Sequence, residues 1–332
     1  MDSRSLIDEI LEVSIVGSFS RVGFQVRRKV FGWGSPSDGS LVGRTALVTG
    51  STSGLGREAA GELAALGARV VLVGRNEAKL ATVRDELADE VGEDRCSMVV
   101  ADMGSLRSVR AAVGQVLAAE ERLDIVVDNA GAIYPERIVG PDGIEATLAI
   151  MAVAPFVLIS GLLPLLERTG DARVISVTSG GMYTQAIDVD DLQWATEDFS
   201  GPRAYARVKR VQVALVREWA RRLRVAGRGG GLGAGRGGLR INAMHPGWAD
   251  TPGVETSLPG FHRVMRPLLR TPEQGADTIV WLAAAAAPAA SSGELWHDRR
   301  VRPTNRVPWT RESAADRTRL WAACEQLTAT PG

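Results

Sequence analysis

Short runs of consecutive apolar residues alternate with helical patterns along most of the chain from Thr45 onward. Continuous rather than alternating apolar strands indicate a sheet covered on both faces, and right-handed crossovers between them give a parallel, doubly wound sheet. The pattern therefore predicts an α/β fold with a seven-stranded parallel sheet in a single domain. The predicted strands are Thr45–Thr49, Arg69–Val73, Ser97–Ala101, Ile125–Asp128, Val174–Thr178, Ile241–Met244 and Leu295–Trp296, and the predicted helices are Leu55–Leu66, Glu77–Val91, Leu106–Ala119, Ile144–Leu166, Tyr205–Val225 and Glu273–Ala287.

The first 40 residues carry a different pattern. Apolar residues from Leu6 to Val30 recur at three- and four-residue spacing, which is typical of amphipathic helices, and a basic stretch ends in Lys29. Residues 32–39 are predicted to be a linker. Two interpretations stay open for residues 5–31: an arm that packs on the domain, and a helix that lies on a membrane surface.

Composition indicates how the rest of the chain is divided into segments. Residues 41–300 are expected to form the domain, and residues 301–332 a C-terminal tail with a short helix. Residues 227–238 (GRGGGLGAGRGG) have no predicted strand before them and no predicted helix after them, so we interpret them as a surface insertion rather than a phosphate-binding loop. Ala146–Leu166 is long enough to span a bilayer, but Pro155 and Pro164 interrupt it, so a buried or interface helix is expected.

Charge and cysteine content limit the classes of ligand and partner that the protein is expected to bind. The 39 basic residues balance 39 acidic residues, which argues against nucleic acid as a partner. Cys96 and Cys324 are too few for a disulfide framework or a zinc cluster, and the three histidines lack metal-ligand spacing, so no metal is expected. No charged n-region followed by an apolar run opens the chain, which favours a cytoplasmic protein.

The first predicted strand runs directly into a glycine-rich turn and a helix. Its sequence, Thr49-Gly50-Ser51-Thr52-Ser53-Gly54-Leu55-Gly56, has the pattern TGxxxGxG. Glycines there permit a tight turn and let the backbone approach a diphosphate, whose charge meets the helix N-terminus. The turn therefore predicts a dinucleotide site built from Gly50, Ser51, Ser53, Gly54, Leu55 and Gly56.

The second predicted strand indicates which dinucleotide binds. A carboxylate at this strand end would pair with the ribose hydroxyls of NAD, whereas a 2′-phosphate requires a cation. The strand ends in Gly74-Arg75-Asn76, and the Arg75 guanidinium offers a planar fork to a phosphate. We therefore expect NADPH to be preferred over NADH, the alternative being that Arg75 is a surface residue in a turn.

Tyr205 and Lys209 are four residues apart in the sequence YARVK, so a helix places both side chains on one face. A phenol titrates near 10, and acid/base work near pH 7 needs a downward shift of about three units. A positive charge about 4 Å away supplies roughly that much at an effective dielectric of 20. The spacing therefore predicts that Lys209 lowers the pKa of Tyr205.

Together these motifs resemble the short-chain dehydrogenases/reductases, over about residues 44–298. The resemblance implies a Rossmann fold, a strand-end catalytic serine at Ser179, and a cofactor role for Tyr205 and Lys209 as well as a catalytic one. It also implies that Asp102 holds the adenine, and that Asn129, Ala130 and Gly131 match the family's NNAG segment, with Asp128 a structural variation. The turn Pro246-Gly247-Trp248-Ala249-Asp250-Thr251 resembles the family's PG motif, which implies cofactor contacts from Pro246, Gly247 and Thr251.

The resemblance can be narrowed. The separation of Ser179 from Tyr205 and the stretch Ile187–Leu192 are similar to those of retinol-dehydrogenase-like members. Met244–Gly253, Leu258–His262 and Gln274–Thr278 resemble one vertebrate member of the family, which also carries a polar, helix-like N-terminal extension of about this length.

One departure from the family concerns the proton relay. Matching Leu148–Pro164 to the family pattern places Met151 where many members have an asparagine. We therefore expect reduced rather than absent turnover. The predicted function is an NADP(H)-dependent oxidoreductase that interconverts an alcohol and a carbonyl on a hydrophobic substrate, with Ser179, Tyr205 and Lys209 at its site. The alternative is an NADP(H)-binding sensor or scaffold with lost turnover. A homodimer through the long apolar helix is a further expectation.

Overall fold

The computed structural model describes residues 3–229, 238–286 and 291–329 and shows one sheet in the order β3-β2-β1-β4-β5-β6-β7-β8. Strands β1 to β7 pair in parallel, and the order reverses between β1 and β4, as in a doubly wound fold. The strands are β1 (Thr45–Thr49), β2 (Arg69–Gly74), β3 (Cys96–Val100), β4 (Ile125–Asp128), β5 (Arg173–Val177), β6 (Arg240–Met244), β7 (Leu295–His297) and β8 (Arg300–Arg302).

The sheet has eight strands rather than the predicted seven. Strand β8 pairs antiparallel with β7 through a two-residue turn. Both turn residues, Asp298 and Arg299, have positive φ angles of 52° and 57°. Hairpin turns of this backbone shape usually contain Asn-Gly or Asp-Gly, and the Asp-Arg pair gives no such signal, which is why the sequence did not indicate the hairpin.

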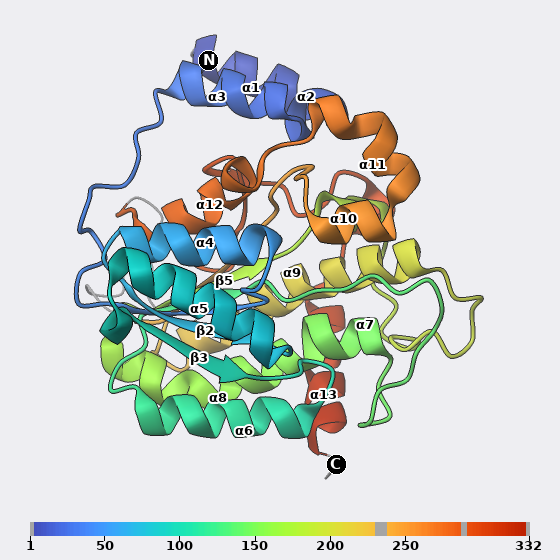
Figure 1. The fold of residues 1–332 in the computed structure, drawn as a ribbon. Helices are drawn as coiled ribbons and strands as arrows, with labels where there is room; N and C mark the ends of the chain where they lie inside the picture. The colour runs from blue at the N-terminus through green and yellow to red at the C-terminus, as the bar shows by residue number, and fades with distance from the viewer. Residues whose placement is uncertain (1–2, 230–237, 287–290, 330–332) are drawn as a thin grey trace.

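Helices cover both faces of the sheet, and apolar side chains fill two layers between them (Figure 1). Helices α4, α5 and α12 cover one face, and α6, α8 and α9 the other, where α13 packs on α9. The helices that cover the sheet are α4 (Gly54–Ala65), α5 (Glu77–Val91), α6 (Leu106–Ala119), α7 (Ala146–Leu148), α8 (Ala154–Thr169), α9 (Gly201–Val225), α12 (Pro272–Ala284) and α13 (Ala314–Ala329). The shorter elements are the helices α10 (Pro252–Ser257) and α11 (Pro259–Met265) and the single turns η1 (Glu93–Arg95), η3 (Gly180–Thr184), η4 (Arg266–Leu268) and η6 (Pro308–Thr310).

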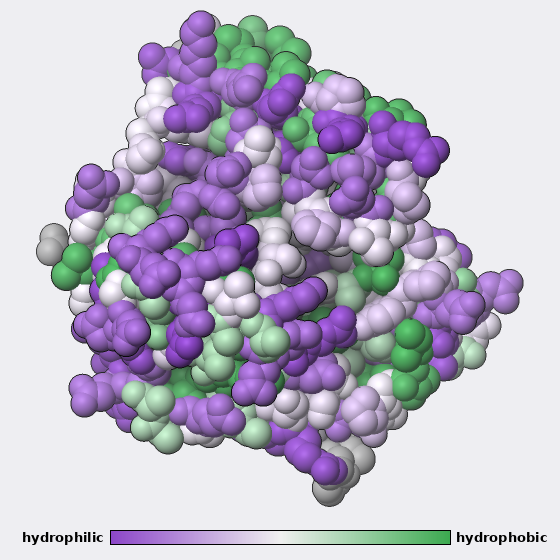
Figure 2. Space-filling model, in the orientation of Figure 1, coloured by the Kyte–Doolittle hydropathy of each residue, from purple (hydrophilic) through white to green (hydrophobic). Residues whose placement is uncertain are grey.

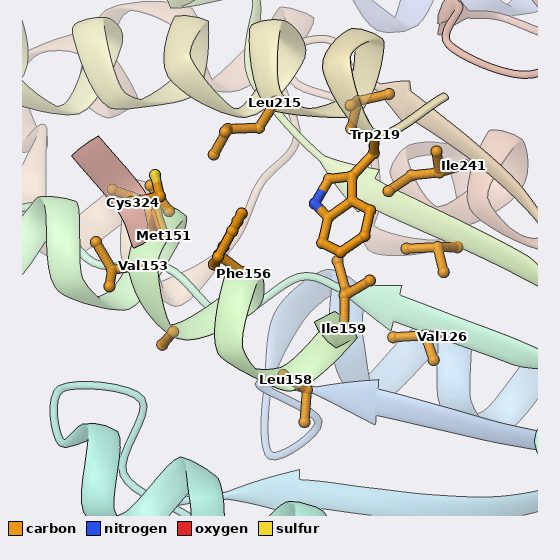
Figure 3. Close-up of a cluster of buried hydrophobic side chains, with 14 of the residues drawn as sticks. Val126, Met151, Val153, Phe156, Leu158, Ile159, Leu215, Trp219, Ile241 and Cys324 are labelled. Atoms are coloured by element: carbon orange, nitrogen blue, oxygen red, sulfur yellow. The ribbon is translucent and has the colours of Figure 1, made fainter. Parts of the chain in front are cut away.

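The long apolar segment forms one continuous helical run from α7 to α8, joined by a π-helical turn, η2 (Ala149–Val153). By length and composition the run Ala146–Thr169 could cross a membrane, but 72% of its apolar stretch is buried inside the fold. Figure 3 shows Phe156 and Ile159 of α8 pointing toward Leu215 and Trp219 of α9. Helix α13, which has 16 residues where a short helix was expected, adds Trp321 to this cluster, with its ring 4.6 Å from that of Trp219. Packing within the chain therefore accounts for the apolar character of this segment.

Three helices at the N-terminus, α1 (Ser3–Val13), α2 (Ile15–Phe19) and α3 (Arg21–Phe31), form a separate layer over the C-terminal part of the sheet (Figure 1). We call this layer the N-terminal cap. Several of its apolar residues point outward, with Val13 85% and Ile10 63% exposed, whereas Phe19 and Phe24 are buried. Figure 2 shows the resulting hydrophobic surface at the top of the molecule. The charged residues Asp8 and Arg27 are buried instead.

The N-terminal cap is attached by buried ion pairs. Arg27 pairs with Asp8 and Asp298 at 2.7 Å each and with Glu12 at 2.9 Å. Asp298 also pairs with Arg270, and Asp8 with Arg302. The sequence predicted a helical arm and left its contacts open; the structure places the arm on the domain with its polar side inward. Of the glycine-rich segment 227–238, residues 230–237 lie outside the described residues.

Candidate active site

A cleft opens where the carboxyl ends of β1 to β4 meet, at the point where the strand order reverses. Ligands of open parallel sheets bind at such a point. Its larger cavity, about 330 Å³, contains most of the predicted cofactor residues. Those that line it are Gly50, Ser53, Gly54, Leu55, Arg75, Asp102, Asn129, Ala130, Gly131 and Thr251.

The glycine-rich turn after β1 has the backbone shape that the sequence predicts. Gly50 has a φ of 66°, in the left-handed region that favours glycine. A Cβ on Gly56 would lie 2.4 Å from the Gly50 carbonyl oxygen and from the Asn129 amide nitrogen, so only glycine fits there. Gly56 and Ser51 do not line the cavity; the buried Ser51 hydroxyl donates to the Val73 carbonyl at 3.2 Å. These two residues therefore hold the turn in place.

Thr49 connects the turn after β1 with the turn after β4, a role that the sequence analysis did not foresee. Its Oγ1 accepts hydrogen bonds from the backbone amides of Asn129 at 2.9 Å and Ala130 at 3.0 Å. In return, the Asn129 side chain donates to the Thr49 carbonyl at 3.0 Å. The two turns that form opposite walls of the cleft are thus fixed to each other by three hydrogen bonds.

Arg75 and Asp102 lie at the outer end of this cavity. Arg75 is exposed and has no hydrogen bond or ion pair with any other residue that the structure describes. Its guanidinium is therefore available to an anion at the end of β2. Asp102 accepts a hydrogen bond from the Gly104 amide at 2.8 Å, which fixes its carboxyl group.

A second cavity, about 180 Å³, continues the cleft toward β5 and β6. It shares Leu55, Asn129 and Thr251 with the first cavity. The predicted catalytic residues Ser179, Tyr205 and Lys209 all line it, together with Pro246 and Gly247 of the PG turn. The structure thus brings the two predicted groups of residues, for cofactor and for chemistry, to one continuous cleft.

Tyr205 and Lys209 lie on one face of α9. The Lys209 Nζ is 5.5 Å from the centre of the Tyr205 ring and donates to the Val177 carbonyl at 2.8 Å. Ser179 begins η3, where its Oγ accepts from the Gly181 amide at 3.3 Å. Three groups that donate or accept protons therefore face one cavity from β5 and α9.

The electrostatics of this group differ from the prediction in one respect. Burial raises the pKa of Tyr205, and the hydrogen bond with Ser179 offsets this in part. Burial also lowers the pKa of Lys209 to about 8, against the attraction of Asp128. The pKa of Tyr205 therefore lies above its usual value, not below it as the four-residue spacing suggests, because the loss of solvation on burial outweighs the Ser179 hydrogen bond.

Met151 occupies the centre of the π-helical turn and is fully buried. A Cβ on Gly131 would lie 3.1 Å from the Met151 sulfur and 3.7 Å from the Lys209 Nζ, so an apolar side chain backs this part of the site. The π-helical turn and Pro155 after it shape the helix here without a side-chain amide.

Several apolar residues close to the site motifs in sequence pack inside the fold and do not line the cavity. Met182 and Trp194 are fully buried in the fold. Trp248 packs against Phe19 of the N-terminal cap, with ring centres 5.8 Å apart. Val254, at the start of α10, does line the cavity beside Tyr205. Periodicity cannot separate the core-facing residues from those that face a cavity.

Comparisons with known proteins agree with this geometry. A family model described as short chain dehydrogenase matches residues 44–187. Human dehydrogenase/reductase SDR family member 12 is 37% identical over 292 residues, which cover 87% of this chain and 88% of the relative. The chain therefore belongs to the short-chain dehydrogenase/reductase family, as an oxidoreductase that acts on CH–OH donors and uses a nicotinamide cofactor.

Two further comparisons extend this assignment. Human retinol dehydrogenase 13 is 28% identical, with 96% of this chain and 94% of the relative covered. A crystal structure described as an NAD(P)-dependent gluconate 5-dehydrogenase from Beutenbergia cavernae, with bound NADP, has a TM-score of 0.61 at 27% identity, covering 78% of this chain and 96% of that one. The predicted resemblance to retinol-dehydrogenase-like members is confirmed.

Proposed function

We propose that this protein is an NADPH-dependent reductase of carbonyl groups on hydrophobic small molecules, with the reverse oxidation available. The observation that carries the proposal is the meeting of Ser179, Tyr205 and Lys209 at one cavity that continues into the glycine-rich cofactor cleft. The Gly56 position admits only glycine, and the Arg75 guanidinium has no partner among the residues that the structure describes; both features fit a dinucleotide with a 2′-phosphate. When bound there, the cofactor supplies the hydride.

The side chains at this cavity would bind the substrate and transfer the proton. The Ser179 hydroxyl would hold the substrate carbonyl oxygen, and the Tyr205 phenol would donate the proton that this oxygen needs as the hydride arrives. Burial raises the pKa of Tyr205, so the phenol is protonated at neutral pH, which is the form that donates a proton during carbonyl reduction. Lys209 would anchor the cofactor ribose and keep a positive charge near the phenol. Leu55, Val177 and Val254 give the cavity an apolar wall.

Deuterium transfer tests this function directly. The purified protein is mixed with NADPH deuterated at C4 of the nicotinamide and with a panel of lipophilic aldehydes and ketones. We expect consumption of NADPH and deuterium at the carbinol carbon of the product. NADPH binding without turnover across the panel would contradict the proposal and support the alternative, a cofactor-binding sensor or scaffold.

The N-terminal cap supports a finer proposal, that the protein works in the cytoplasm against an anionic bilayer. Its exposed Ile10, Val13 and Ile15 form an apolar surface, and exposed Arg28 and Lys29 on α3 add positive charge. Apolar residues combined with cations are what binds a helix to the interface of an anionic membrane. Deleting the cap would remove the Ser18 and Phe19 carbonyls that bind Arg270 and the Asp8 carboxylate that binds Arg302, so single surface substitutions are the better probe.

Flotation with vesicles tests the membrane contact. Val13→Asp should reduce binding to phosphatidylserine-containing vesicles, whereas Val225→Asp, at a residue similarly exposed but on α9, should leave it intact. Equal binding by both variants would contradict the proposal. A second copy of this chain could cover the same apolar surface, and sedimentation of the same variants tests this. If the native protein forms a dimer that Val13→Asp abolishes, and the native protein does not bind vesicles, the surface is a homodimer interface and the membrane proposal is contradicted.

A further inference from the structure

Asp128 is a buried carboxyl group that the sequence analysis interpreted as a structural variation. It ends β4, opposite Ser176 of β5, and is 1% exposed. Its Oδ2 accepts hydrogen bonds from the Ser176 hydroxyl at 2.8 Å and from the Gln212 amide at 3.3 Å. Its Oδ1 has no hydrogen-bond partner among the described residues. A buried carboxyl group that is only half satisfied calls for a physical reason.

Lys209 lies on the same side of the sheet as this carboxyl group. It precedes Gln212 by three residues on α9, so both side chains lie on the face that meets β4 and β5. Its Nζ donates to the carbonyl of Val177, the residue after Ser176. Against the larger effect of burial, the charge of Lys209 lowers the pKa of Asp128, and the charge of Asp128 raises the pKa of Lys209.

The other groups that face Asp128 carry no charge. Ser176 from β5, Gln212 from α9 and Met151 from the π-helical turn line the small cavity beside it. A buried ammonium in such surroundings loses its proton readily. The Met151 side chain near Lys209 offers no hydrogen-bonding group to the ammonium. Among the described residues of this layer, Asp128 is the one group of opposite charge.

We propose that Asp128 is a positioning residue whose carboxylate keeps Lys209 protonated at the active site. This rests on the proposed function, in which Lys209 acts on Tyr205 and on the cofactor ribose. Asp128 would act through Lys209 and touch neither substrate nor cofactor.

The ionisation of the two groups is consistent with this role. Burial raises the pKa of Asp128 to about 6, and burial lowers the pKa of Lys209 to about 8. Near pH 7 the carboxylate is therefore ionised while the amine is protonated. Below about pH 6 the carboxylate is neutralised, and above about pH 8 the ammonium is lost, so the charged pair exists between these values.

The scarcity of lysine makes the pair directly measurable. The chain has three lysines, and Lys29 and Lys79 are exposed. Lysine labelled with ¹³C at Cε therefore gives three NMR signals, and the one that disappears in Lys209→Arg belongs to Lys209. The titration midpoint of this signal is read in the native protein, in Asp128→Asn, and in the control Asp124→Asn. Asp124 is a buried carboxylate at the other end of β4, paired with Arg122.

We expect Asp128→Asn to move the Lys209 midpoint down by about one pH unit or more, the usual effect of removing a nearby opposite charge. Asp124→Asn should leave it in place. An unchanged midpoint in Asp128→Asn would overturn the proposal. If Asp128→Asn does not fold, the native protein decides: its Lys209 signal should also shift near pH 6 as Asp128 titrates, and a signal without this step would overturn the proposal. Because the readout needs no turnover, it stands apart from any failure of the proposed reaction.

Discussion

The cofactor cleft and the N-terminal cap are assembled by opposite means. The cleft uses backbone turns and a few neutral hydrogen bonds, such as those that the Asn129 and Ala130 amides donate to the Thr49 hydroxyl. The cap buries several full charges, with Arg27, Arg270 and Asp298 each at most 1% exposed. In the cleft each element contributes a short local motif, whereas the cap joins residues nearly 300 positions apart, such as Asp8 and Arg302.

The N-terminal cap also contacts the turn beside the active site. The cap residue Phe19 accepts hydrogen bonds through its carbonyl from the Trp248 amide at 2.8 Å and from Arg270 at 3.0 Å. Gly247 lies against the same carbonyl, where a Cβ would come within 2.7 Å. The N-terminal cap therefore supports the PG turn that closes the catalytic cavity. In this way the cap, which is held by ion pairs, positions part of the cleft.

The largest expected effect is on the stability of the cap. Arg27→Met should lower the free energy of unfolding by about 3 kcal/mol, because Asp8 and Asp298 would each lose one buried cationic partner and keep Arg302 and Arg270, respectively. Urea unfolding measures this. The control is Arg57→Met, which removes an exposed pair with Glu86 and should cost at most about 1 kcal/mol. Equal losses in the two variants would mean that the cap is not held by its ion pairs.

Acid should also weaken the attachment of the cap. Burial lowers the pKa of His297 to about 4 and that of His245 well below its usual value. A histidine with a depressed folded pKa stabilises the protein above its unfolded pKa of about 6.5, and this stability is lost as the pH falls toward the folded value. His297 alone should cost about 3 kcal/mol between pH 6.5 and 4. Unfolding of His297→Gln should show a shallower decline over this range; an equally steep decline would remove His297 as its source.

In the cleft, Arg75→Gln should weaken NADPH binding by roughly 10- to 100-fold and leave NADH binding unchanged, because one charge-assisted hydrogen bond contributes about 1.5–3 kcal/mol. Lys79→Gln, an exposed cation nearby on α5, should change neither. Dissociation constants from fluorescence titration measure both effects. Equal affinity of the native protein for NADPH and NADH would contradict the assignment of the 2′-phosphate to Arg75.

The smallest effect is expected at Met151. Because a π-helical turn already shapes the helix there, Met151→Asn should change kcat by less than about threefold, or roughly 0.7 kcal/mol in the barrier. Steady-state rates at saturating NADPH measure it. A tenfold gain would mean that the missing amide limits turnover, as the sequence first suggested.

The two regions also differ in how far they could be predicted. The glycine-rich turn, the YxxxK spacing and the parallel strands depend on neighbours in sequence, so Gly50, Tyr205 and Lys209 could be placed in one cleft. The contacts of Asp8 and Arg27 depend on partners near the other end of the chain, and apolar periodicity suggested which residues were helical but not which side faced inward. Strand β8 was missed because Asp298 and Arg299 are an uncommon hairpin turn. The partnership of Asp128 with Lys209 required the register of β4 with β5 and α9.

The central claim is that the Tyr205 phenol delivers the proton while the cleft holds the cofactor. Tyr205→Phe keeps the ring and removes the hydroxyl, so it separates proton delivery from cofactor binding. NADPH affinity and kcat/KM for a carbonyl substrate should be measured on the same preparation. We predict an affinity close to that of the native protein and a fall in kcat/KM of at least about 100-fold. Comparable rates in the variant and the native protein would contradict the mechanism.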